Sequence, residues 1–123
     1  TEWLALSPSG RLEIAHWYCW DGPSGPTTDT AGAMRGSLVH DALYQLIRLG
    51  LLHESLRATA DEEYRRLLEE DAAVIVERRY WSWLHPALIA AAKARAAVHF
   101  GFLRAFGWTS TDPEAERPVL TAP

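Results

Sequence analysis

Apolar residues recur at helical spacing over three long stretches of this chain. The first stretch runs from about residue 34 to 49 and stops at Gly50, a residue type that favours a helix C-terminus. The second covers about residues 60–76, and the third about residues 86–106, where Pro86 suits a first-turn position. The pattern therefore predicts three helices.

The two later helices carry further signals. Thr59 followed by Glu62 forms a capping box, so we expect the second helix to begin at Ala60. The third helix is apolar almost all round, so we expect it to be central or to pack against a partner. Its narrow exposed strip should comprise Lys93, Ala97, Phe100 and Arg104. One continuous core is expected from Leu38, Leu43, Leu46, Leu67, Leu68, Ile75, Val98 and Leu103.

Near the N-terminus, residues 3–6 and 12–19 flank the segment Ser7-Pro8-Ser9-Gly10. Proline at the second turn position and glycine at the fourth suit a type I turn, so a β-hairpin is predicted. The glycines and prolines within residues 21–30 predict a shaped loop. The predicted fold class is mainly α (α+β): a short N-terminal β-hairpin, two antiparallel helices, and a third long apolar helix packed across them.

The chain length of 123 residues suits one domain, because domains commonly hold about 100 to 150 residues. We expect the hairpin over residues 1–19, the Gly/Pro loop over 20–33, the helical core over 34–106 and a loose tail over 109–123.

Composition and charge argue against two classes of protein, those that bind nucleic acid and those that cross a membrane. With 48% hydrophobic residues the chain can bury a core without disulfides, and Cys19 is its single cysteine. The net charge of −4 argues against a nucleic-acid partner. The longest uncharged apolar run, residues 80–92, is shorter than the roughly 20 residues that span a bilayer, so no transmembrane segment is predicted. The single cysteine and the lack of a visible signal peptide favour a cytoplasmic or virion-associated location.

The first helix contains the polar pattern HDxxY. His40 and Tyr44 lie one turn apart on the same face, whereas Asp41 points toward a neighbouring face. Such side chains are costly to bury in an apolar helix unless each finds a partner or ligand. With Asp61 at the start of the second helix, His40 is a candidate base, Asp41 a metal ligand and Asp61 the group that orients the base. Alternatively, His40 and Asp61 form a buried structural pair, and both interpretations place them within hydrogen-bond reach.

The loop of residues 21–30 is a candidate for binding a cation or an anion through its backbone groups, or it is a rigid turn. Ser24, in GPSGP, departs from the GxSxG pattern of serine hydrolases, and the other histidines lack a zinc-binding spacing. Tryptophans could mark an interfacial or oligomer surface, or could be core residues. The five tryptophans of this set, out of six in the chain, are Trp17, Trp20, Trp81, Trp83 and Trp108.

The order of these motifs resembles two kinds of protein. DGxSGP, a helix with HDxxY, and then ADxxY in the next helix resemble a family of small bacteriophage and prophage proteins of unknown function, over roughly residues 20–80. The same order resembles phospholipase A2, especially its disulfide-free viral form. Phospholipase A2 has a Gly-rich calcium loop, HDxxY on its first long helix, and an aspartate on the antiparallel second helix.

The resemblance to phospholipase A2 implies a role for each matching residue. His40 would be the general base that activates water, Asp61 its orienting partner, and Tyr44 a hydrogen-bond support. Asp41 would bind calcium together with backbone carbonyls around Gly22 and Gly25. Because the cysteines that pin the helices of the secreted enzymes are absent, packing would have to hold the two helices together.

The leading functional hypothesis is therefore a calcium-dependent, phospholipase A2-like lipid ester hydrolase. The rival is a non-catalytic phage-type structural or interaction protein in which His40, Asp41 and Asp61 are a buried polar staple. The expected partner is a phospholipid surface or another virion or host protein, and a homo-oligomer could form through the Trp-rich surface.

Overall fold

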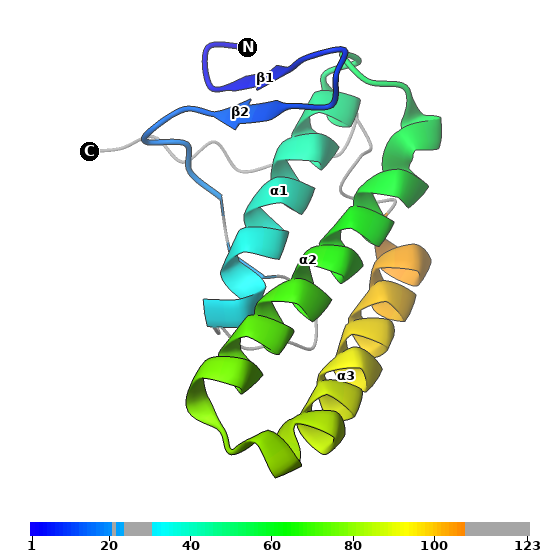
Figure 1. Cartoon of the computed structure of the whole chain (residues 1–123). Helices are drawn as coiled ribbons and strands as arrows, with labels where there is room; N and C mark the ends of the chain where they lie inside the picture. Colours follow the sequence, from blue (N-terminus) through cyan, green and yellow to red (C-terminus); the bar gives the residue numbers. More distant parts are fainter. Residues whose placement is uncertain (21, 24–30, 108–123) are drawn as a thin grey trace, which may run out of the picture.

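The computed structural model describes residues 1–20, 22–23 and 31–107. Two short strands precede three helices, which confirms the mainly α fold with an N-terminal hairpin (Figure 1). The elements are β1 (Leu4–Leu6), β2 (Leu12–Ile14), α1 (Ala31–Arg48), α2 (Arg57–Arg79) and α3 (His85–Phe106), with single 3-10 turns at Glu54–Leu56 and Ser82–Leu84.

β1 and β2 pair antiparallel, with Leu4 opposite Ile14. The predicted turn joins them: Gly10 N donates to Ser7 O at 2.9 Å, and Gly10 has the left-handed φ of 84° that glycine tolerates. The second strand ends at Ile14, so its predicted extension to residue 19 is wrong. The chain turns there instead, because Tyr18 N donates to Ala15 O at 3.2 Å and Trp17 has a φ of 74°.

The hairpin packs on the C-terminal half of α1. Leu4, only 1% exposed, meets Ala42 and Leu46 in one apolar cluster. Further along the chain, the Tyr18 hydroxyl donates to Gln45 Oε1 at 2.8 Å. These contacts fix the segment that leads from the hairpin into the Gly/Pro loop.

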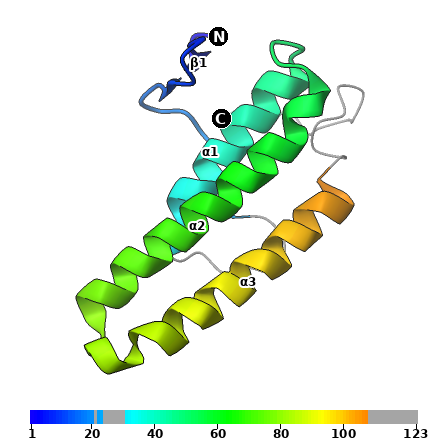
Figure 2. The ribbon, with the colours of Figure 1, turned by 45° about the vertical axis from the view of Figure 1, so that its right-hand side comes forward.

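α1 and α2 lie antiparallel and in contact along most of their length (Figure 2). Glycine permits this approach, because a Cβ at Gly36 would stand only 3.0 Å from Tyr64 Cδ2. α1 begins at Ala31, before the predicted residue 34. It ends at Arg48, and Gly50 follows with a left-handed φ of 69°, as a helix C-terminus favours.

α2 begins earlier than predicted, at Arg57, so the capping box of Thr59 and Glu62 is wrong. The 3-10 turn Glu54–Leu56 runs straight into the helix, which leaves Thr59 inside it. The side chain of His53 caps that turn instead by accepting a hydrogen bond from Ser55 N. α2 also continues to Arg79, beyond the predicted end at residue 76.

α3 has nearly the predicted limits, but it is neither central nor enclosed. It packs chiefly against α2, so only one stripe of it is covered: Ala96, His99 and Leu103. Val98, predicted to be core, is 62% exposed. The buried residues form three clusters and not one continuous core. Within the described ranges, no helix is both long and apolar enough to cross a membrane.

Replacing Leu68 by alanine is expected to lower the free energy of unfolding by about 2–5 kcal/mol, as deletions of buried leucine do. Leu68 is 4% exposed and lies with Tyr64 and Leu103 in the cluster that joins α2 to α3. Urea unfolding followed by circular dichroism measures the loss. Val74→Ala is the control, because Val74 lies on the same helix but is 45% exposed, and a change within about 0.5 kcal/mol is expected there. Equal losses in the two variants would contradict the register of α2.

Candidate functional site

A buried polar group joins α1 to α2 at the level of His40. His40 Nε2 donates to Asp61 Oδ1 at 3.1 Å, which confirms the predicted hydrogen bond between them. Both residues are buried: Asp61 is 0% exposed and His40 is 6% exposed. Two helices therefore hold one imidazole and one carboxylate in fixed orientation away from water.

Tyr44 supports the same carboxylate. Its hydroxyl donates to Asp61 Oδ1 at 2.5 Å, and its ring lies 4.0 Å from the His40 ring, centroid to centroid. The spacing of one helical turn places both side chains on the face of α1 that meets α2. Asp61 Oδ1 thus accepts two hydrogen bonds from α1.

Asp41 lies on the other side of the imidazole. His40 Nδ1 is 3.5 Å from Asp41 Oδ1, so each ring nitrogen faces a carboxylate. The Asp41 side chain is 24% exposed, whereas that of Asp61 is completely buried. The site is therefore drier at Asp61 than at its wetter end, Asp41, although the Oδ2 atom of Asp41 is also buried.

These contacts change the proton affinity of the site. Burial disfavours the charged imidazole, but the carboxylates of Asp41 and Asp61 outweigh it, so the pKa of His40 is raised. Burial also disfavours a charged Asp61, but hydrogen bonds from His40 and Tyr44 outweigh it and lower its pKa. Burial and the neighbouring Asp61 raise the pKa of Tyr44, which keeps its hydroxyl a donor.

Two contributors were not predicted from the sequence. Arg104, expected on the exposed strip of α3, places Nη1 3.6 Å from Asp61 Oδ2, which has no hydrogen-bond partner among the described residues. Tyr64 packs its ring 5.3 Å from that of His40, centroid to centroid. The ADxxY spacing signals Tyr64, since it lies one turn from Asp61, but no local pattern signals Arg104.

The predicted loop carbonyls are placed only in part. Gly22 has a left-handed φ of 82°, whereas Gly25 and Ser24 lie outside the described residues. Just before Gly22, Trp20 Nε1 donates to Ser37 Oγ at 3.2 Å. Ser37 is one helical turn before Asp41, so this bond ties the start of the loop to the helix that carries the site.

Asp41 and the backbone carbonyl of Gly22 carry oxygen atoms, the ligand type that calcium prefers. Over residues 1–20, 22–23 and 31–107, no group of three or more His, Cys, Asp or Glu side chains could hold a metal ion. A calcium ion beside Asp41 would therefore take most of its other ligands from backbone carbonyls and water. That donor set is chemically suited to calcium and unsuited to zinc.

The tryptophans do not form one cluster. Trp17 lies near the hairpin and is 81% exposed, whereas Trp81 and Trp83 precede α3 at the opposite end of the bundle and are 75% and 71% exposed (Figure 1). The alternative that they are core residues is wrong for these three. Trp108 lies outside the described residues.

No known family model matches this sequence, and no curated protein or solved structure matches it either. Arguments about activity therefore rest on the geometry of His40 and its neighbours. A histidine oriented by a buried carboxylate is suited to moving a proton, and a second carboxylate beside it is suited to holding a cation or the charged imidazole.

The melting temperature is expected to fall as the pH rises above neutrality. Because the folded pKa of His40 exceeds the usual 6.5, its contribution to stability is complete below that pH and is lost as the pH rises through the folded value. Asp61 acts oppositely: its folded pKa lies below the usual 3.8, so its contribution is present above that pH and is lost on further acidification. Melting curves from about pH 4 to 9 test this. His40→Asn should flatten the alkaline side, and an unchanged profile would contradict the assignment.

Proposed function

We propose that this chain is a calcium-dependent, phospholipase A2-like hydrolase of lipid esters, with His40 as general base. The observation that carries the proposal is the shared carboxylate: His40 Nε2 and the Tyr44 hydroxyl both donate to Asp61 Oδ1. This arrangement holds the imidazole with Nε2 protonated. The other ring nitrogen is then directed toward Asp41 and the wetter end of the site.

In the proposed reaction, the neutral form of His40 accepts a proton from water at Nδ1 while the water oxygen bonds to the ester carbonyl carbon. Asp61 stabilises the imidazolium that results, and Tyr44 keeps the carboxylate in place. The proton then passes to the departing alkoxide, so the products are a fatty acid and an alcohol. Asp41 and the carbonyl of Gly22, with Gly25 as a further candidate, would hold calcium. When bound, calcium supplies positive charge that polarises the ester carbonyl.

A second candidate function is a non-catalytic structural or interaction protein, of the kind found in phage particles, that binds a virion or host protein. The observation that favours it is internal satisfaction, because each ring nitrogen of His40 already faces a carboxylate of the chain. In this alternative the polar group is a staple that selects one packing of α1 against α2.

Fatty acid release from phosphatidylcholine vesicles, measured with calcium and then with a chelator, separates the two functions. The hydrolase releases fatty acid only with calcium. The staple releases none, and calcium leaves its melting temperature unchanged. No turnover together with no melting shift at millimolar calcium would refute the hydrolase.

Asp41→Asn is expected to weaken calcium binding and to raise the calcium concentration needed for half-maximal activity. The substitution removes a full negative charge from the proposed ligands while keeping the side-chain shape. Calcium titrations of activity and of melting temperature measure the effect. Asp71→Asn is the matched control, because it removes the same charge from a residue outside the proposed site. Asp71 lies on α2 and forms an ion pair at 2.7 Å with Arg35 of α1. An equal change in both variants would argue against a calcium site at Asp41.

A further inference from the structure

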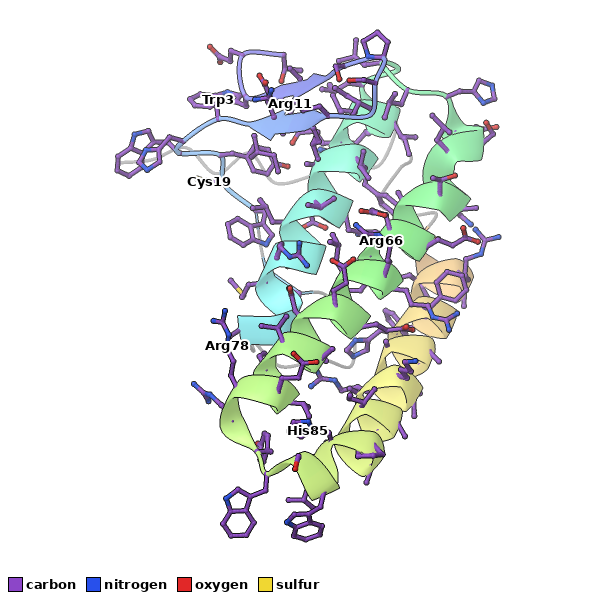
Figure 3. All side chains as sticks on the ribbon, viewed as in Figure 1. Trp3, Arg11, Cys19, Arg66, Arg78 and His85 are labelled. Atoms are coloured by element: carbon purple, nitrogen blue, oxygen red, sulfur yellow. The ribbon has the colours of Figure 1, made fainter. Side chains whose placement is uncertain are left out.

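Large aromatic side chains are exposed to solvent in the turn that connects α2 to α3. Tyr80, Trp81 and Trp83 are 48%, 75% and 71% exposed, and the two indole rings lie 6.5 Å apart, centroid to centroid. This turn is at the end of the bundle away from the hairpin, where the labelled Arg78 and His85 also lie (Figure 3). Folding of α2 and α3 does not require these rings, because neither indole is buried.

The apolar surface continues from this turn along α3. Exposed apolar residues recur there at helical spacing and point away from the buried stripe of Ala96, His99 and Leu103. Val98 and Phe102, the larger of them, are 62% and 37% exposed. The residues that follow this spacing are Ala87, Ala91, Ala94, Val98, Phe102 and Ala105. We call this face, together with Tyr80, Trp81 and Trp83, the α3 surface.

The charged residues of the segment that carries the α3 surface, residues 78–107, all have one sign, and Glu77 directly precedes this segment. Residues 78–107 contain no Asp or Glu, although the whole chain has a net charge of −4. The basic residues in this range are Arg78, Arg79, Lys93, Arg95 and Arg104. Arg78 and Arg79 are exposed beside the aromatic turn, and Arg95 is exposed one turn before Val98. A partner that covers this surface must therefore supply negative charge and accept apolar side chains.

We propose that the α3 surface binds the face of an anionic phospholipid bilayer. Tryptophan and tyrosine are suited to the boundary between headgroups and acyl chains, and arginines pair with lipid phosphates. An apolar helix face flanked by basic residues lies in that boundary without crossing the bilayer. A second copy of the chain fits less well, because two α3 surfaces facing each other would bring the Arg95 side chains of the two copies together, and residues 78–107 hold no carboxylate to pair with them.

The aromatic turn of the α3 surface lies far from the polar site, and the inference holds whether or not His40 catalyses. Between Asp61 and Arg79, α2 rises by roughly 27 Å at its usual pitch, which separates the aromatic turn from the buried carboxylate. Binding is therefore measured with chelator present, where no turnover occurs. Catalysis is tested independently with a water-soluble short-chain ester, so failure of one proposal is distinguishable from failure of the other.

The test is flotation of the full chain with vesicles of phosphatidylcholine containing about one third phosphatidylserine, and with phosphatidylcholine alone. The chain is expected to float with the anionic vesicles at low salt and to be released at high salt. Trp81→Ala/Trp83→Ala should lower the partition coefficient at least about tenfold, since two interfacial rings are lost. Arg78→Gln/Arg79→Gln should lower it about fivefold for each arginine.

Trp17→Ala is the matched control, because Trp17 is 81% exposed but lies at the hairpin end, and its binding should equal that of the unmodified chain. Val98→Glu should also weaken flotation by placing a negative charge in the apolar stripe. Circular dichroism of each variant shows whether the helices are intact. Three results would overturn the proposal: no flotation with anionic vesicles, an equal loss in Trp17→Ala, or a lipid-free dimer in solution that Val98→Glu dissociates.

Discussion

Replacement of His40 by alanine is expected to lower the rate of fatty acid release by about 10² to 10⁴, the usual cost of losing one general base. The expectation follows from the site's geometry, in which Asp61 orients the imidazole through a 3.1 Å hydrogen bond. The measurement is the initial rate with vesicles at saturating calcium, under conditions where circular dichroism shows the variant to be folded.

His16→Ala is the control for this substitution, since His16 is exposed near the hairpin and contacts Trp17 instead of the polar site. Its rate should equal that of the unmodified chain. If both variants keep full activity, any hydrolysis observed does not depend on His40. If neither the unmodified chain nor the variants release fatty acid, the staple function is supported.

Replacement of Asp61 by alanine is expected to lower the free energy of unfolding by about 3–5 kcal/mol, as removal of one partner from a buried ion pair does. Asp61 is completely buried and accepts hydrogen bonds from His40 and Tyr44, so the substitution leaves two buried donors without their acceptor. This loss is expected under either proposed function. Urea unfolding gives the value.

Glu62→Ala supplies the comparison, because Glu62 is the next residue of α2 but is exposed, and a change within about 0.5 kcal/mol is expected. A double variant lacking both His40 and Asp61 should lose less than the sum of the two single losses, since the side chains share one interaction. Additive losses would show that the two residues stabilise the chain independently.

The sequence by itself was sufficient to predict the helices and the central contact of the site. Apolar spacing located α1, α2 and α3 to within a few residues, because helix formation depends on periodic patterns and on local signals such as Gly50 and Pro86. The spacing within HDxxY placed His40 and Tyr44 on one face of a helix. An aspartate at the start of an antiparallel helix then met both of them.

Other features depended on contacts between distant segments, which local spacing does not encode. α2 begins at Arg57 and not at the predicted Ala60, because a preceding 3-10 turn runs into the helix. Arg104 reached Asp61 only because α3 folds back along α2. α3 also remained largely exposed, since a helix that packs chiefly against one neighbour covers a single stripe, however apolar its other faces are. Composition shows how much apolar surface a helix has, but only the tertiary arrangement decides how much of it is buried.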